Sequence, residues 1–128
     1  MYQRLILCGN LGRDPELRHT TKGDPVCSLS VAVNRRYKDK ATGETRSRTT
    51  WFRVTTWGNM AEACAKHLVK GQQVLVEGEM LPAKPFESKS GQWLADLVVN
   101  ASSITWGAKP KRDGQGAPGS PDDEEMPF

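Results

Sequence analysis

The chain has 128 residues, of which 37% are hydrophobic and 26% are charged, with a net charge of +3 and three cysteines. This length fits one domain of about 105 residues, and no stretch approaches the roughly 20 apolar residues of a membrane span or resembles a secretion signal, so we expect a cytoplasmic protein without a membrane partner. Three cysteines without a C-x-x-C pair argue against a disulfide framework and against a zinc site, and we expect all three to be small buried residues.

The charge is divided unevenly along the chain. Residues 1–106 carry 15 Lys and Arg against 10 Asp and Glu, a balance of +5, whereas residues 107–128 carry 3 against 5, a balance of −2. A basic domain favours an acidic partner, although so mild an excess does not by itself establish nucleic-acid binding.

Strand-like segments occupy the first half of the chain. Residues 4–11 form a near-continuous apolar run, and residues 25–33 alternate apolar with small or polar side chains, as a half-buried strand does. Residues 35–48 are charged and contain a turn sequence at 40–44, which predicts the tip of a long exposed hairpin. Residues 49–57, rich in Thr, Val and aromatic side chains, predict a third strand.

A short helix and two further strands are predicted in the second half. Asn59, with Glu62 three positions later, predicts a helix start, and Gly71 predicts its end. Apolar residues follow at helical spacing, namely Ala61, Cys64, Ala65 and Leu68. Residues 73–81 alternate as a fourth strand, and a polar, proline-containing loop leads to a fifth strand at residues 93–106.

This order of elements predicts an all-β fold, a five-stranded OB-fold barrel with one short helix between strands 3 and 4. Other small barrels, and five-stranded sheets with one helix, share the same order. Beyond residues 1–106 we expect a flexible linker at 107–121, because it has too few apolar residues to offset the entropy of folding. An acidic tip at 122–128 completes a disordered tail.

The third strand separates two kinds of side chain. Phe52 and Val54 point into the core, while Trp51, Arg53 and Trp57 share the opposite face, because strand side chains alternate. Aromatic planes stack on bases without regard to sequence, and a guanidinium beside them neutralises phosphate. The pattern favours binding of single-stranded nucleic acid, with rings that seal the barrel as the alternative.

Further aromatic residues lie in the charged hairpins and in the last strand. Tyr37 and Phe86 stand among Lys and Arg in the two polar hairpins, where an exposed ring favours a flat ligand and a ring folded onto the barrel is the alternative. We expect Trp93 and Trp106 of the last strand to pack.

Basic residues are frequent in the same segments and are candidates for phosphate contacts, with an ordinary solvated surface as the alternative. They are Arg4, Arg35, Arg36, Lys38, Lys40, Arg46, Arg48, Arg53, Lys70 and Lys84.

Catalytic and metal-binding patterns are weak. His19 and His67 have no nucleophile near them in sequence, and Glu77 and Glu79 are typical of an exposed strand face. We therefore expect no enzymatic activity, no cofactor and no bound metal.

Several segments together resemble one known family, the bacterial single-stranded DNA-binding proteins. The resemblance covers essentially all of residues 1–106 and resumes at the tip. The matching segments are Leu7–Arg18, Asp39–Glu44, Thr50–Val54, Gly58–Glu62, Lys70–Val74 and Val76–Gly78.

The resemblance implies a homotetramer of barrels around which single-stranded DNA wraps, present in the cytoplasm with the nucleoid. The stacking residues of the family match Tyr37, Trp51, Trp57 and Phe86, although Tyr37 and Phe86 stand where tryptophan is common and Trp57 where phenylalanine is common. The family also implies a C-terminal tip that recruits enzymes of replication, recombination and repair, here Asp122, Asp123, Glu124, Glu125, Met126, Pro127 and Phe128.

The tip is chemically suited to a protein partner. The Phe128 ring and its carboxylate would fill a pocket rimmed by Arg or Lys, and the preceding carboxylates would steer the approach. An RNA-binding barrel and a replication-restart adaptor remain the alternative functions, since stacking rings do not distinguish ribose from deoxyribose.

Overall fold

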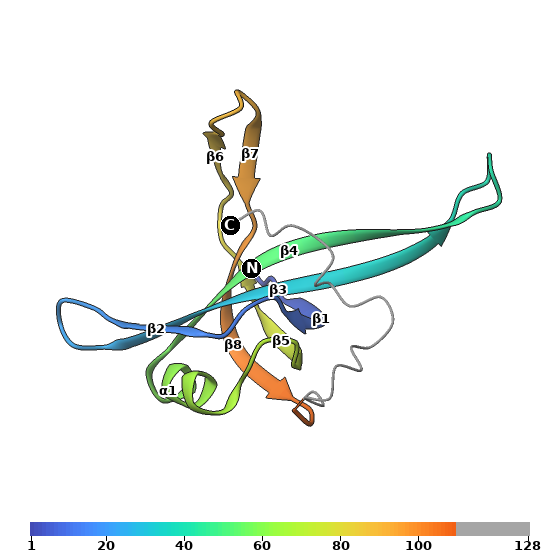
Figure 1. Cartoon of the computed structure of the whole chain (residues 1–128). Helices are drawn as coiled ribbons and strands as arrows, with labels where there is room; N and C mark the ends of the chain where they lie inside the picture. The colour runs from blue at the N-terminus through green and yellow to red at the C-terminus, as the bar shows by residue number, and fades with distance from the viewer. Residues whose placement is uncertain (110–128) are drawn as a thin grey trace.

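The computed structural model describes residues 1–109, and five of its strands close into a barrel with one helix at its end (Figure 1). The barrel strands are β1 (Leu5–Leu11), β3 (Pro25–Lys38), β4 (Thr45–Trp57), β5 (Gln73–Met80) and β8 (Val98–Trp106). Their order is β1-β5-β8-β4-β3, and pairing of Asn10 and Leu11 with Ala32 and Val31 joins β1 to β3. The predicted all-β OB-fold barrel is therefore confirmed.

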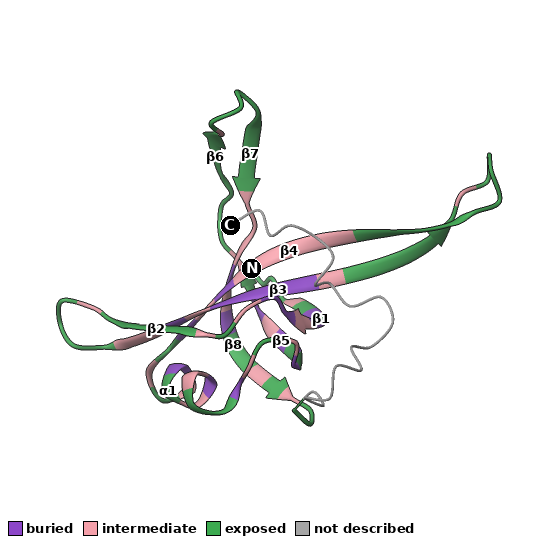
Figure 2. Ribbon diagram, viewed as in Figure 1, coloured by how far each residue is buried: buried purple, intermediate pink, exposed green. Residues whose placement is uncertain are grey.

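Alternating side chains fill the barrel because each strand turns every second residue inward. Leu29 and Val31 of β3, Val54 of β4, and Val74 and Val76 of β5 are almost completely buried. Figure 2 shows this burial concentrated where the strands cross, while the far end of the long β3–β4 ribbon, its arm, is exposed. The core thus holds the centre of the ribbon and leaves its arm outside.

Three hairpin arms extend from the barrel, and two of them contain short strands in addition to the five barrel strands. These strands are β2 (Glu16–His19), which pairs with β3, and the hairpin formed by β6 (Lys84–Glu87) and β7 (Trp93–Asp96). The third arm is the predicted charged hairpin, in which β3 runs on to Lys38 and β4 starts at Thr45. Figure 1 shows the arms pointing away from one another.

The helix α1 (Gly58–His67) corrects the predicted helix boundaries. Its N-cap residue is Trp57 in an extended conformation, with no side-chain cap, so Asn59 lies inside the first turn and does not cap it. The helix ends before Leu68, and Gly71 lies in the following turn with φ of 87°, where its N–H donates to the carbonyl of Leu11 (2.8 Å). The glycine therefore docks a loop against β1 and does not terminate the helix. Within residues 1–109, α1 falls short of the length and apolarity needed to cross a membrane.

Trp93 corrects a second expectation and Trp106 confirms one. Trp106 packs against the core and stacks on His67 with ring centroids 6.1 Å apart. Trp93 does not pack, because the predicted fifth strand is interrupted at Leu97 and Trp93 belongs to β7 in the outer hairpin, where it is 71% exposed.

A β-bulge in β8 brings two backbones unusually close at Gly78. The register shifts between Glu77, which pairs with Ser103, and Gly78, which pairs with Ala101. A Cβ atom added to Gly78 would fall on the carbonyl oxygen of Asn100. Only glycine allows this approach without a backbone shift.

Gly78→Ala is therefore expected to destabilise the barrel by about 2 kcal/mol or more, because backbone atoms must move to admit one methyl group. Urea unfolding followed by circular dichroism measures the change. Gly107→Ala is the matched control, since a Cβ there meets no atom within 4 Å. Equal stability of the two variants would contradict the close approach.

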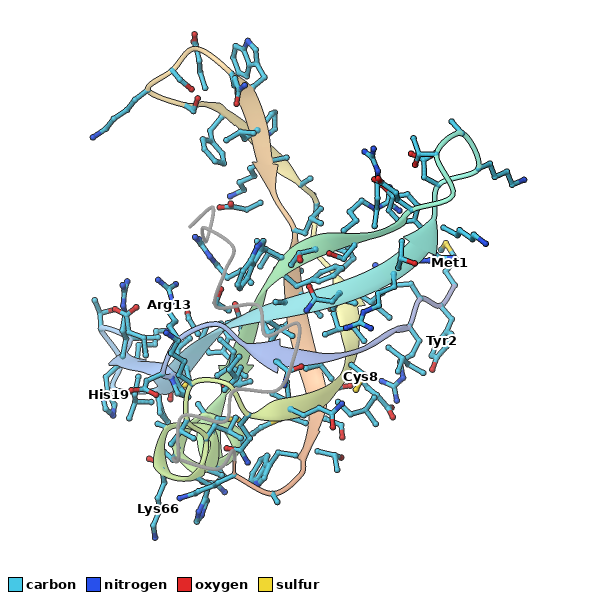
Figure 3. The ribbon with its side chains drawn as sticks, turned by 45° about the vertical axis from the view of Figure 1, so that its right-hand side comes forward. Met1, Tyr2, Cys8, Arg13, His19 and Lys66 are labelled. Carbon is cyan, nitrogen blue, oxygen red and sulfur yellow. The ribbon has the colours of Figure 1, made fainter. Side chains whose placement is uncertain are left out.

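The cysteines differ in exposure, and one of them corrects the expectation that all three are buried. Cys27 and Cys64 are buried, whereas Cys8 is exposed on the outer face of β1 (Figure 3). Burial raises the pKa of the Cys27 thiol, and it raises the pKa of the Cys64 thiol to about 11.

We expect an aromatic disulfide reagent at pH 8 to reach Cys27 and Cys64 only after denaturation, because both thiols are buried within the chain itself. The raised pKa of Cys64 also makes the stability depend on pH. Below about pH 9, the ordinary pKa of a thiol, Cys64 is neutral in both the folded and the unfolded chain, and its contribution to the stability is complete. Above that pH the unfolded chain releases the proton first, so the free energy of unfolding should fall as pH rises through about 11. Rapid labelling of all three thiols in the native protein would contradict this assignment.

Candidate nucleic-acid interface

The outer face of β4 carries the predicted aromatic residues. Cross-strand pairing places Trp51 beside Ala32, Arg53 beside Ser30 and Trp57 beside Val26, so these side chains share one face. Phe52 packs against the core and Val54 is buried on the other face, as predicted. The two tryptophans are six positions apart along β4, about 20 Å at roughly 3.4 Å per residue. The guanidinium of Arg53 lies between them.

Trp57 is held in place although it is exposed. Its ring is 48% exposed, and its Nε1–H donates to Oδ1 of Asn100 at 3.0 Å. Asn100 reaches this position because β8 runs parallel to β4 and pairs Asn100 with Thr55. The indole is thus oriented on the sheet before any ligand arrives.

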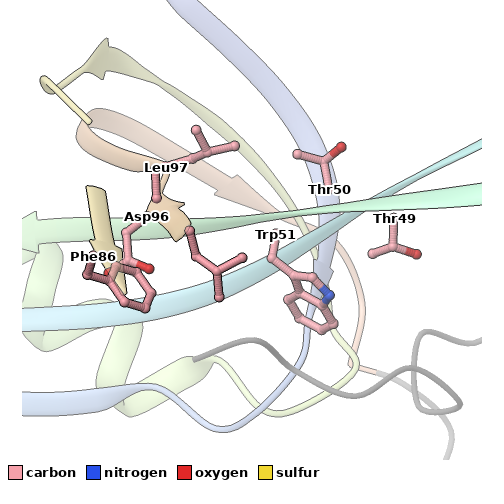
Figure 4. A pocket seen from close by; sticks show the side chains of 8 residues that line it. Thr49, Thr50, Trp51, Phe86, Asp96 and Leu97 are labelled. Carbon is pink, nitrogen blue, oxygen red and sulfur yellow. The ribbon is translucent and has the colours of Figure 1, made fainter. Parts of the chain in front are cut away.

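Trp51 and Phe86 line one groove, which has a volume of about 270 Å³. Trp51 projects from β4, and Phe86 comes from the β6–β7 hairpin, where it is 40% exposed. Figure 4 shows Trp51 on one side of the groove, with Phe86 and Asp96 on the other. The remaining lining residues are Thr49, Thr50, Leu94, Ala95 and Leu97.

Tyr37 lies apart from this groove. It pairs with Arg46 near the end of the charged arm, five positions beyond the Ala32–Trp51 pair, or about 17 Å along the strand. Along β3, Tyr37 occupies one of the alternate positions whose side chains face the barrel interior. Its ring therefore lies on the opposite face of the ribbon from Trp51. The ring is 45% exposed on the arm.

Apart from Lys70, the predicted basic residues fall into two groups. Those of the first group form ion pairs with carboxylates of the chain. Arg4 has an ion pair to Glu77 (3.5 Å) and a hydrogen bond to Ser102 (2.8 Å). Arg46 pairs with Asp39 (3.3 Å), and Arg53 pairs with Asp96 (3.5 Å).

The second group has no ion pair with any carboxylate of residues 1–109. Five of its members lie on the β3–β4 arm and the sixth lies on the β6–β7 hairpin beside the groove. They are Arg35, Arg36, Lys38, Lys40, Arg48 and Lys84. Lys70 lies apart, where its backbone N–H donates to Asp14 (2.8 Å) in the turn before β5.

Asp96 is the residue at this site that sequence reasoning missed. It lines the groove at the point where β7 ends, one residue before β8 begins at Val98. A single acidic residue in a segment predicted as one continuous strand gives no signal of this position.

The predicted tip at Asp122–Phe128 lies outside the described residues.

Comparison with known proteins agrees with the fold and with the resemblance seen in the sequence. The chain is similar over 84% of its length to a Plasmodium falciparum SSB solved in complex with ssDNA, with a TM-score of 0.68 and 22% sequence identity, covering 96% of that chain. It is also similar to a deletion mutant of the single-stranded DNA binding protein from Thermus aquaticus, with a TM-score of 0.65 and 27% identity over 82% of its length, and there it spans half of that chain. Residues 2–106 match the model of the single-strand binding protein family. The chain therefore belongs to the single-strand binding protein family.

Proposed function

We propose that this chain binds single-stranded DNA largely without reading its sequence, and that it wraps and protects the strand. The observation that carries the proposal is the β4 face, where Trp51 and Trp57 flank Arg53 and Phe86 closes the groove beside Trp51. Stacking on exposed rings requires unpaired bases, so a duplex is a poor ligand for such a face. Membership of the single-strand binding family supports the same ligand.

The roles of the individual residues follow from this placement. Trp51, Trp57 and Phe86 stack on bases, and Tyr37 meets a base farther along the strand, on the arm. The cations of the arm and Lys84 neutralise phosphates, to which Lys70 adds a contact at the far end of the barrel. Arg53 and Arg4 take part only if they exchange their carboxylate partners for phosphate.

The test is the quenching of intrinsic tryptophan fluorescence by oligo-dT, by RNA of equal length and by duplex DNA, each at low and high salt. Strong quenching by oligo-dT that persists at high salt, with weak and salt-sensitive duplex binding, is the expected result, because stacking is screened less than phosphate contacts. An equal response to RNA would favour the RNA-binding alternative, and the absence of quenching would favour an adaptor barrel.

We propose further that the barrels assemble as a homotetramer. The outer face of β1 and β5 supports association, because the apolar side chains of Ile6 and Leu75 are exposed there in the single chain. Sedimentation equilibrium should give the mass of four chains, and the mass of one chain would contradict the assembly.

The acidic tip completes the proposed function by recruiting enzymes of replication, recombination and repair to DNA-bound protein near the nucleoid. Its sequence supports this role, since the aromatic Phe128 follows four carboxylates and an apolar residue. No catalytic role is proposed for the chain itself.

Deletion of Phe128 is expected to abolish recruitment and to leave the affinity for oligo-dT unchanged, because all the proposed stacking residues belong to residues 1–106. Proteins retained from a bacterial lysate by the two forms, identified by mass spectrometry, provide the comparison. Retention of the same enzymes by both forms would contradict the role of the tip.

A further inference from the structure

We propose that the groove between Trp51 and Phe86 prefers a base that carries an exocyclic amine, and that Asp96 accepts a hydrogen bond from that amine. At this one position cytosine is then bound more tightly than thymine. The inference rests on the proposed function, because it concerns how a stacked base is held.

The groove has two aromatic walls and one carboxylate. In the β6–β7 hairpin Phe86 pairs with Leu94 and Lys84 pairs with Asp96, so alternation places these four side chains on the same face of the hairpin, turned toward Trp51. All of them except Lys84 line the groove. In Figure 4 Asp96 and Phe86 both lie on the side of the groove opposite Trp51. A base stacked in this groove therefore presents its edge within reach of a carboxylate.

The carboxylate retains acceptor capacity. The Asp96 side chain is only 25% exposed, and its Oδ2 lies 3.5 Å from Nη1 of Arg53. Among the described residues 1–109, the structure records no hydrogen bond to its other oxygen, Oδ1. An ionised carboxylate only accepts hydrogen bonds and is costly to desolvate without a donor, so a ligand entering the groove must supply one.

That requirement selects among the parts of a nucleotide. A phosphate is repelled by the carboxylate and is better placed outside the groove, near Lys84. The two pyrimidines differ at the edge that a stacked ring presents, since cytosine carries the N4 amine, a donor, where thymine carries the O4 carbonyl, an acceptor. Thymine also has a donor at N3, but it is flanked by two carbonyl oxygens that a carboxylate repels. The amine-bearing base is thus the better ligand for Asp96.

The first experiment uses the full chain and oligonucleotides of equal length. We compare the ratio of the dissociation constants for oligo-dT and oligo-dC in the wild type, in Asp96→Asn and in Glu87→Gln. Asn retains the shape of Asp but is neutral and offers a donor to O4, so the ratio should shift toward thymine by about three- to tenfold. Glu87 lies on the opposite face of the same hairpin, paired with Trp93, so its substitution removes one negative charge and should leave the ratio unchanged.

The ratio separates recognition of the base from effects on phosphate binding. Asp96→Asn also removes the ion pair with Arg53, which should raise the affinity for both oligonucleotides equally and cancel in the ratio. A second comparison controls for the ring methyl group, because oligo-5-methyl-dC shares it with oligo-dT and differs in the amine-bearing edge. The wild type should bind the 5-methyl-dC strand more tightly than oligo-dT, and Asp96→Asn should reduce this preference by the same factor as in the first experiment.

The outcomes distinguish the inference from the function on which it rests. Binding of both strands with an unchanged ratio in Asp96→Asn overturns the role of Asp96 and leaves the proposed function intact. A shift of equal size in Glu87→Gln also overturns it, because net charge would then explain the preference. Failure of the wild type to bind either strand overturns both proposals.

Discussion

Trp51→Ala should weaken the binding of oligo-dT by about 1–3 kcal/mol, which corresponds to roughly a 5- to 150-fold increase in the dissociation constant. The effect is expected to be large because Trp51 is half-buried, so its ring is oriented before binding, and because it forms one wall of the groove that Phe86 closes. A base that enters between two rings has much less stacking surface when one of them is removed.

Trp51→Phe is the matched control, because it retains an aromatic plane at the same position and should recover most of the affinity. Fluorescence anisotropy of a labelled oligo-dT measures both variants, and thermal unfolding reports their stability. A large decrease in the stability of Trp51→Ala, with an equal decrease in binding, would show instead that the ring belongs to the core. The affinity should change much more than the melting temperature, since Trp51 is absent from the buried core around Val54.

The groove illustrates what the sequence could predict and what it could not. Alternation within β4 separated Trp51 from Phe52 correctly, because every second side chain of a half-buried strand faces the same way. Phe86 was expected on an exposed hairpin, but its position beside Trp51 depends on how that hairpin leaves the barrel. The pairing of β6 with β7, and the interruption between β7 and β8 at Leu97, set this position and that of Asp96. No local pattern encodes such an interruption.

Exposure explains the elements that the sequence reading missed. Strands β2 and β6 have no buried residue, so their sequences lack the apolar alternation by which a strand is recognised. Trp93 was assigned to the packed strand because its hydrophobicity matched that pattern, and only the pairing of β7 with β6 shows that it lies on an outer hairpin. The barrel strands, in contrast, were recognisable because their interiors are buried on one face.

The β3–β4 arm should dominate the electrostatic part of the binding. Arg35 and Arg48 are direct cross-strand partners on one face, an arrangement that is destabilising between like charges. Neither has an ion pair with a carboxylate in the described part of the chain, residues 1–109. A phosphate placed between the two guanidinium groups would relieve their repulsion, which makes this pair a strong site for a DNA backbone.

The double variant Arg35→Gln and Arg48→Gln is expected to bind oligo-dT more weakly at low salt and to lower the slope of log K against log salt by about 0.7 for each phosphate that is no longer neutralised. Removal of the like-charge pair should also leave the stability unchanged or slightly higher. Titrations at several salt concentrations measure the slope, and urea unfolding measures the stability. Lys66→Gln on α1, at the end of the molecule away from the arm (Figure 3), is the control that removes a positive charge elsewhere.

The two measurements together distinguish a phosphate site from general attraction. If Lys66→Gln lowered the slope as much as each arm substitution does, the net charge of the domain would account for binding and the arm would have no special role. If the double variant were less stable, the arginines would support the arm itself. A DNA-binding arm requires that the double variant has a smaller slope of log K against log salt and an unchanged stability. The two arginines would then contribute to binding of phosphate and not to the stability of the fold.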